Sequence, residues 1–212
     1  MTKENLFLDY GGLIVNYDFN EKTLLRAHNL FLDYINSFNG NLINLQNLSK
    51  AHNKAIRTYL EARQKDNSEW HLDKIIGLML SDLGINVPVS EVSEIYKLKD
   101  HDSKPFPNSK QILVDLSKTH KLGIISNLPH NSLIYELRKE EMLNLFDPIV
   151  ISYQVGFRKP HPAIYQEAMR RANAKPEKCI FVSHDEPEVK GAEAVGIRGI
   201  LVKSLEEVIG IL

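Results

Sequence analysis

The chain has 212 residues, of which 43% are hydrophobic and 25% charged, a composition typical of globular proteins. Its 26 Lys and Arg residues against 27 Asp and Glu residues give a formal net charge of −1, so no positive excess favours nucleic acid or an anionic membrane as partner. No apolar run approaches the roughly 20 residues that span a bilayer. The single cysteine, Cys179, has no partner for an intrachain disulfide. We therefore expect a small-molecule substrate and a cytoplasmic setting, while the oligomeric state stays open.

The first stretch with a clear pattern leads into Asp9. Three apolar residues, Leu6-Phe7-Leu8, precede Asp9, and two glycines, Gly11 and Gly12, follow it closely. The pattern predicts a buried strand that ends by presenting an acid to a tight loop. Ligands of open parallel sheets bind beyond the carboxyl ends of the strands, so Asp9 is the first candidate for chemistry. An Asp that only stabilises a turn is the alternative interpretation.

The next part of the chain, from Asn20 to about Leu98, has apolar residues at helical spacing and almost no strand signal. Four helices are predicted, over residues 24–35, 48–60, 70–84 and 91–98. A polar break at residues 39–41 separates the first two, Gly84 is expected to end the third, and Ser90 is expected to cap the fourth. Because about 80 residues of helix exceed a single crossover between strands, we expect a small helical bundle inserted after the first strand.

Strand and helix signals alternate after residue 100. Strands are predicted at residues 122–125, 149–151, 179–182 and 199–202, and the helices between them include 132–145 and 163–172. Apolar strands that are separated by helices predict a parallel sheet covered on both faces. The predicted fold class is therefore α/β, with the helical bundle as an insertion.

Polar residues follow several of these strands at the point where each strand ends. They are Ser126 and Asn127 after one strand, Ser183, His184 and Asp185 after another, and Lys159 in a loop before a helix. Because parallel strands joined by right-handed crossovers point the same way, these residues are expected to converge with Asp9 in one crevice. Each also has a purely structural interpretation, such as a solvated surface charge for Lys159.

Four motifs in this order resemble those of the haloacid dehalogenase-like (HAD) hydrolase superfamily. They are Asp9-x-Gly-Gly, Gly123-Ile124-Ile125-Ser126-Asn127, Gly156-Phe157-Arg158-Lys159-Pro160-x-Pro162-x-Ile164-Tyr165, and Phe181-Val182-Ser183-His184-Asp185 with Gly191-Ala192 and Gly196. The resemblance covers essentially the whole chain. It implies a Rossmann-like catalytic core of residues 1–17 and 101–212, a helical cap of residues 18–100 that closes over the substrate, and covalent catalysis by Asp9.

A carboxylate such as Asp9 can attack phosphorus or an electron-poor carbon, forming an acyl phosphate or an ester that water then hydrolyses. Because like charge opposes attack on a phosphate dianion, we expect Lys159 to screen Asp9 and the transferred group. Ser126 is expected to donate a hydrogen bond to a substrate oxygen, and Asn127 to orient neighbouring groups. The resemblance implies Mg²⁺ as cofactor, held by Asp9, the backbone carbonyl of Gly11 and an acid of the last motif.

Position 11 departs from the phosphatases of this superfamily, in which the residue two past the nucleophile is usually a second Asp that acts as general acid and base. Gly11 has no side chain to move a proton, so the proton must come from elsewhere or the leaving group must be a good one. His184, at the mouth of the crevice, is the candidate proton carrier. A loop histidine bonded to a backbone carbonyl is the alternative.

The last motif also departs from the pattern of this superfamily. Counting back from Gly191-Ala192, the superfamily's first metal-binding Asp aligns with Ser183 and the next position with His184. Glu188 is then the preferred metal ligand and Asp185 the second candidate. Gly11, Gly12 and Ser183 are expected to belong to the loops around the substrate.

The same motif is similar to that of metal-free L-2-haloacid dehalogenases, in which Asp9 would displace a halide from carbon. Those enzymes have an aromatic residue in place of Gly11 and an Arg early in the cap, whereas this chain has no Arg between Arg26 and Arg57. This favours hydrolysis of a small phosphorylated metabolite. A third hypothesis is a binding protein that has lost catalysis, since Gly11 and Ser183 are changes that such decay would leave.

Overall fold

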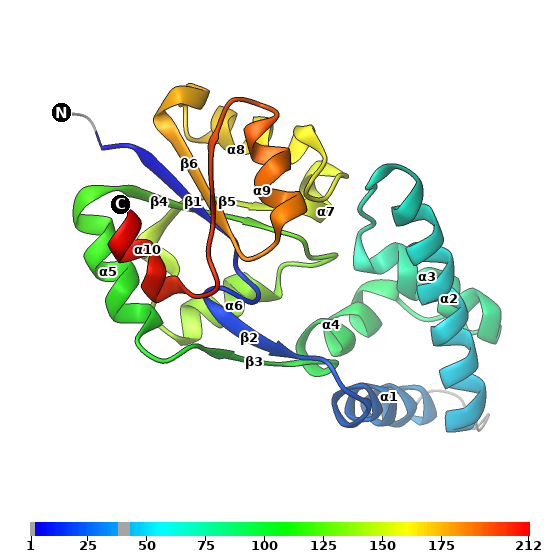
Figure 1. The fold of residues 1–212 in the computed structure, drawn as a ribbon. Helices are drawn as coiled ribbons and strands as arrows, with labels where there is room; N and C mark the ends of the chain where they lie inside the picture. The colour runs from blue at the N-terminus through cyan, green and yellow to red at the C-terminus, as the bar shows by residue number, and fades with distance from the viewer. Residues whose placement is uncertain (1–2, 38–42) are drawn as a thin grey trace. The chain divides into compact units, whose positions relative to one another are not determined.

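The computed structural model describes residues 3–37 and 43–212 (Figure 1). The chain divides into two compact units, one of Met1–Tyr17 with Ser103–Leu212 and one of Asp18–Asp102. Each unit has its own buried hydrophobic cluster. That the units are a catalytic core and a cap stays a prediction. The polar break predicted at residues 39–41 lies outside the described residues.

The first unit is built on a five-stranded sheet among the described residues. Its strands are β1 (Asn5–Leu8), β4 (Lys121–Ser126), β5 (Phe146–Ile151), β6 (Cys179–Ser183) and β7 (Arg198–Leu201). The strand order is β5-β4-β1-β6-β7, and neighbouring strands are parallel. The predicted α/β fold with a parallel sheet is therefore confirmed, with β1 in the centre, so the carboxyl end of β1 is flanked on both sides by the ends of other strands.

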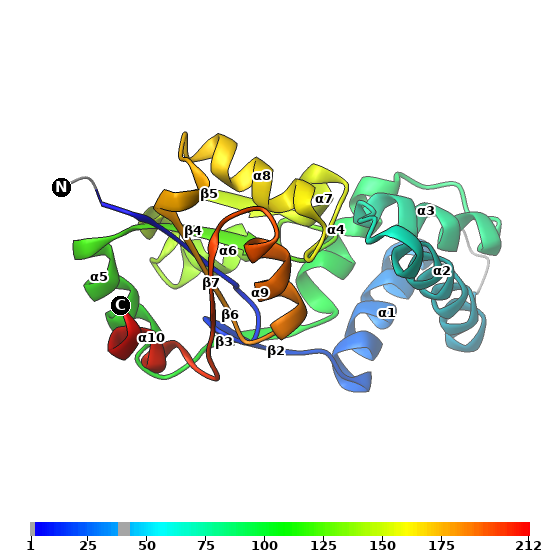
Figure 2. The same cartoon turned by 45° about the horizontal axis from the view of Figure 1, so that its top comes forward.

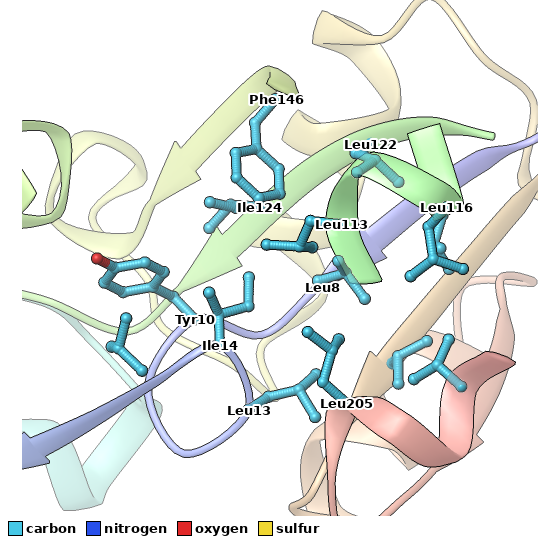
Figure 3. Close-up of a cluster of buried hydrophobic side chains, with 14 of the residues drawn as sticks. Leu8, Tyr10, Leu13, Ile14, Leu113, Leu116, Leu122, Ile124, Phe146 and Leu205 are labelled. Carbon is cyan, nitrogen blue, oxygen red and sulfur yellow. The ribbon is translucent and has the colours of Figure 1, made fainter. Parts of the chain in front are cut away.

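Helices cover both faces of this sheet because successive strand residues point to opposite sides. Leu6 and Leu8 of β1 join one cluster, which Figure 3 shows, whereas Phe7 joins the other. The first face is covered by α5 (Ser109–Thr119), α6 (Ser132–Lys139) and α10 (Leu205–Ile211). The second face is covered by α8 (Pro162–Arg171) and α9 (Glu186–Glu193) (Figure 1). A short helix, α7 (Ser152–Val155), and two 3₁₀ turns, η1 (Leu143–Leu145) and η2 (Pro176–Lys178), complete the connections.

The structure corrects the sequence-based elements at two places in this unit. The helix predicted over residues 132–145 ends at Lys139, because Glu141 takes a left-handed conformation and the Met142 amide bonds back to the Leu137 carbonyl, as at many helix ends. A pair of short strands was missed: β2 (Val15–Asp18) and β3 (Asp102–Pro105) lie side by side as a two-stranded sheet (Figure 2). Four-residue strands with few apolar residues carry little periodicity to detect.

The second unit consists of α1 (Glu21–Asn36), α2 (Leu45–Asp66), α3 (Leu72–Leu83) and α4 (Val89–Lys99). Gly84 ends α3 in a left-handed conformation, φ 67°, as predicted. The predicted cap at Ser90 is wrong: α4 begins at Val89, two residues before the predicted start, and its first turn has no side-chain cap. Within the described residues, none of the helices in either unit combines the length and apolar character that crossing a membrane requires.

Candidate active site

Asp9 lies directly after β1, where the backbone and its own side chain are both held. Its backbone N–H donates to the carbonyl of Val182 on β6, with an N···O distance of 2.9 Å. Its Oδ1 atom accepts the N–H of Tyr10 at 2.8 Å. The residue is only 6% exposed. A carboxylate is thus fixed in a buried position at the carboxyl end of the central strand, where a charge needs a partner.

Lys159 supplies that partner. Its Nζ atom lies 2.6 Å from Asp9 Oδ1 and 2.8 Å from Glu188 Oε2, and the residue is 2% exposed. Burial would raise the pKa of Asp9, but the adjacent ammonium and hydrogen bonds hold it below its ordinary value. Burial opposes the charge of Lys159 too, yet the two carboxylates raise its pKa. Asp9 is therefore an ionised carboxylate that is buried and paired with a cation.

Asn127 connects this ion pair to the sheet. It follows β4, its Oδ1 accepts the backbone N–H of Lys159 at 2.7 Å, and its Nδ2 donates to the Lys159 carbonyl at 3.2 Å. The same Nδ2 donates to Glu188 Oε1 at 3.0 Å. One amide therefore fixes the backbone of the lysine and the carboxylate that faces it. Ser126, the last residue of β4, directly precedes Asn127 and is 3% exposed.

The contact between Glu188 and Lys159 is one that the sequence interpretation missed. Glu188 was predicted to bind metal, whereas its Oε2 accepts from both Lys159 Nζ and Ser183 Oγ, the latter at 2.9 Å. The sequence held one sign of this contact, the glycine at position 191, three residues after Glu188. A side chain there would come within 2.7 Å of Pro160, so the glycine lets α9 pack against the lysine loop and brings Glu188 beside it.

Ser183 and His184 face the second oxygen of Asp9. Ser183 Oγ lies 3.4 Å from Asp9 Oδ2, and His184 Nδ1 lies 3.4 Å from the same oxygen. The His184 side chain is 43% exposed, so it lies at the edge of the site. Its hydrogen bond with Asp9 raises the pKa of the imidazole above its ordinary value. Oδ2 is therefore the more weakly held oxygen of Asp9.

Rings fill the space beside the two glycines of the loop. A Cβ atom at Gly11 would lie 2.9 Å from the ring of Tyr17, and one at Gly12 would lie 2.4 Å from the ring of His184. Gly12 also has a φ of 80°, which few other residues adopt. Tyr17 is tied down, since its hydroxyl donates to Glu136 at 3.0 Å. A side chain at position 11 would thus meet a ring that is held in place.

A divalent cation beside Asp9 would need oxygen donors that are not already bound. Both oxygens of Glu188 accept hydrogen bonds within the site. Asp185 accepts the backbone N–H of Glu188 at 3.2 Å and so caps α9. Across residues 3–37 and 43–212, no three His, Cys, Asp or Glu side chains are grouped so as to hold a metal ion. The two acids of the last motif that the resemblance assigned to Mg²⁺ are therefore both engaged in contacts within the chain.

The structure thus gathers most of the predicted site residues around Asp9. Direct contacts join Asp9, Asn127, Lys159, Ser183 and Glu188, which we call the ionic cluster, and His184 lies at its edge. Ser126 lies at the adjacent strand end. Asp185 is used as a helix cap instead. The catalytic roles of all these residues stay predictions.

Comparison with known proteins identifies the family. Residues 29–202 match the family model described as haloacid dehalogenase-like hydrolase. A glyceraldehyde 3-phosphate phosphatase from Methanothermobacter thermautotrophicus is 39% identical over 103 residues, which are 48% of this chain and 46% of the relative. A phosphorylated carbohydrates phosphatase from Thermotoga maritima is 32% identical over 93 residues, 43% of each chain. The match thus spans about half the length of these curated relatives.

Solved structures show the same fold at low identity. A 2-haloacid dehalogenase from Pseudomonas syringae pv. Tomato superposes with a TM-score of 0.64 and 19% identity, covering 94% of this chain and 86% of that one. A putative HAD-hydrolase from Bacillus subtilis, bound to magnesium, superposes with a TM-score of 0.60 and 15% identity, covering 100% of this chain and 99% of that one. Both likenesses concern the fold.

Proposed function

The chain belongs to the haloacid dehalogenase-like hydrolases, and on this premise we propose that it hydrolyses phosphate monoesters of small metabolites with Asp9 as the nucleophile. The observation that carries the proposal is the buried ion pair between Asp9 and Lys159, at 2.6 Å, at the end of the central strand. It provides a nucleophile together with a fixed cation, which attack on a phosphate dianion needs. The two relatives named as phosphatases support the same reaction class.

Asp9 acts through its less tightly held oxygen. Oδ1 is held by Lys159 and by the Tyr10 amide, so Oδ2 is the oxygen that attacks phosphorus. A bond forms from Oδ2 to phosphorus while the bond from phosphorus to the leaving oxygen breaks, giving an aspartyl phosphate and an alcohol. Water then attacks this acyl phosphate, releases inorganic phosphate and restores the carboxylate.

Lys159 stabilises the negative charge that Asp9 and the phosphoryl oxygens share during transfer. Asn127 acts on Lys159 through the backbone bonds described above, and so holds the ammonium in place. Ser126 donates a hydrogen bond to a phosphoryl oxygen. The roles of Ser126 and Asn127 agree with their positions at the end of β4, the strand beside β1.

His184 carries the proton that Gly11 cannot carry. Its imidazole lies 3.4 Å from Asp9 Oδ2 at the edge of the site, and it is exposed enough to exchange protons with water. It gives a proton to the leaving oxygen in the first step and takes one from the attacking water in the second. Magnesium, the cofactor that the resemblance implies, stays a prediction, and no step above passes through it.

The test compares the purified wild-type chain with Asp9→Asn on a panel of phosphate esters. The panel includes glyceraldehyde 3-phosphate, sugar phosphates and a chromogenic aryl phosphate, each with Mg²⁺ or with EDTA. We expect phosphate release by the wild type and a loss of about 1,000-fold or more in Asp9→Asn, because the amide is a poor nucleophile. Asp115→Asn, the same change on the exposed surface of α5, is the matched control and should retain full activity.

Carbon–halogen hydrolysis is a second candidate, because Ser183 contacts Asp9 and because no three His, Cys, Asp or Glu side chains among the described residues are grouped to hold a metal ion, as suits a metal-free site. Halide release from 2-chloropropionate, insensitive to EDTA and lost in Asp9→Asn, would select it over phosphate release. If neither product forms with any substrate, the chain is a binding protein that keeps the fold, and the proposed function fails.

A further inference from the structure

We propose that the imidazole of His184 occupies the place beside Asp9 that a divalent cation would take, so that this site works without Mg²⁺. The claim that the site binds no Mg²⁺ rests on the geometry of the site, and the claim that the site works without Mg²⁺ rests on the proposed function. The proposal goes beyond that function because it assigns the groups that surround the nucleophile to side chains of this chain.

The first step of the argument concerns which oxygen of Asp9 is open to an ion. Oδ1 already has two partners, Lys159 Nζ at 2.6 Å and the Tyr10 N–H at 2.8 Å. A metal ion would therefore have to bind Oδ2. That oxygen faces Ser183 Oγ and His184 Nδ1, each at 3.4 Å, so the open side of the carboxylate is bordered by a hydroxyl and an imidazole.

The second step concerns the space next to Oδ2. The ring of His184 packs onto Gly12, with Cε1 2.4 Å and Nε2 2.7 Å from the position that a Cβ atom would take. A side chain at position 12 would displace this ring. The loop backbone and the imidazole therefore fit against each other, and this packing holds the ring beside Oδ2 of Asp9.

The third step concerns the remaining ligands. Mg²⁺ binds through carboxylate and carbonyl oxygens in near-octahedral geometry. The carboxylate of Glu188 already neutralises Lys159 and accepts from Asn127, and Asp185 accepts a backbone N–H at the start of α9. Recruiting Glu188 would remove one of the two carboxylate partners of Lys159, and recruiting Asp185 would remove the side-chain cap of α9.

The fourth step concerns charge. The ionic cluster contains two carboxylates and one ammonium, Lys159. Oδ2 of Asp9 faces the imidazole of His184, with Nδ1 at 3.4 Å, where a metal site would need a further acid. A carboxylate at position 184 would place a third acid beside Asp9 and create demand for a metal ion.

The experiment measures binding of Mg²⁺ alone to the full chain by calorimetry, in the absence of substrate. The wild type is expected to show no saturable site, and its thermal unfolding midpoint is expected to be the same with Mg²⁺ as with EDTA. His184→Asp is expected to bind one Mg²⁺ per chain at least about tenfold more tightly than His184→Asn. The Asn variant is the matched control because it has the same shape without the charge.

One Mg²⁺ bound per wild-type chain, and lost in Asp9→Asn, would overturn the proposal. So would equal Mg²⁺ binding by the Asp and Asn variants at position 184, because the imidazole would then not be what excludes the ion. The wild-type titration decides the matter even where a variant does not fold.

Activity separates this proposal from the proposed function. Equal phosphate release in Mg²⁺ and EDTA supports both, and release that requires Mg²⁺ overturns this proposal and keeps the function. Release of no product overturns the function alone, because the Mg²⁺ titration is read without substrate.

Discussion

Two groups of buried polar side chains, one in each unit, differ in how they are satisfied. In the ionic cluster of the first unit, each charged group has a partner of opposite charge, at 2.6 Å and 2.8 Å around Lys159. In the second unit, rings of His28, His52 and Tyr96 pack together with centroids 5.1–5.9 Å apart, and Ser93 lies on the same helix as Tyr96. We call these four residues the imidazole cluster. Among the described residues, it holds four of the five buried side-chain polar atoms that lack a hydrogen bond.

The difference follows from charge. An unpaired ion is so costly in a protein interior that its site persists only when fully paired, whereas a neutral polar group costs about 1–3 kcal/mol. Burial lowers the pKa of His28, and lowers that of His52 to about 4, so both imidazoles stay neutral at pH 7. Burial of titratable groups alone therefore does not identify an active site. Convergence of opposite charges at a strand end is the more specific sign.

Removing the cation should produce the largest change in stability. Lys159→Met leaves the carboxylates of Asp9 and Glu188 buried without a counter-charge, and we expect the free energy of unfolding at pH 7 to fall by about 3–5 kcal/mol. Denaturant titration measures it. Lys110→Met, which breaks the exposed pair with Glu141, is the matched control and should leave stability nearly unchanged. A loss as small as the control's would mean that the ionic cluster is not held by charge pairing.

Acid should act mainly on the imidazole cluster. The pKa of His52 is about 4 in the folded chain against an ordinary value of 6.5, so the unfolded chain binds the proton first as pH falls. The stability is complete above pH 6.5 and decreases as pH falls towards 4, by about 3 kcal/mol from this group. His52→Phe should show a smaller decrease than wild type in that window, measured by unfolding at each pH. His120→Phe, outside the cluster, should follow the wild type; identical pH profiles for all three would contradict the assignment.

His184, at the edge of the ionic cluster, allows a test through rate instead of stability. If it carries the proton, His184→Gln should lower the turnover number on alkyl phosphates by at least about tenfold, or 1.4 kcal/mol in activation free energy. Aryl phosphates, whose leaving groups need no proton, should lose much less. Since the side chain is 43% exposed, the unfolding free energy should hardly change. An unchanged rate on alkyl phosphates would dismiss the role.

The smallest effect should come from removing a single hydroxyl in each unit. The hydroxyl of Tyr96 is buried without a partner, so Tyr96→Phe should leave stability unchanged or raise it by about 1 kcal/mol. The hydroxyl of Tyr165 donates to the Glu188 carbonyl at 2.6 Å, so Tyr165→Phe should lower stability by about 1 kcal/mol. Equal changes in the two unfolding curves, or a loss of stability in Tyr96→Phe and none in Tyr165→Phe, would remove the contrast between the units.

The sequence predicted what depends on strand direction and failed where contacts between distant elements decide. Apolar runs that end in Asp9 and Asn127 indicated both the sheet and the place where these side chains meet, because the ends of parallel strands share an edge. The Glu188–Lys159 pair was not predicted, since it depends on how closely α9 approaches a loop. The imidazole cluster was invisible for the same reason: His28 and His52 lie on different helices, and nothing local marks their contact.

The packing of Tyr17 on Gly11 makes the order of substitutions important for engineering this site. An acid introduced at position 11 by itself meets the Tyr17 ring, which Glu136 holds. A smaller residue at position 17 alone leaves a void and brings no benefit. The two changes are expected to be non-additive, so a variant with an acid at 11 is reached only when position 17 is altered first or at the same time.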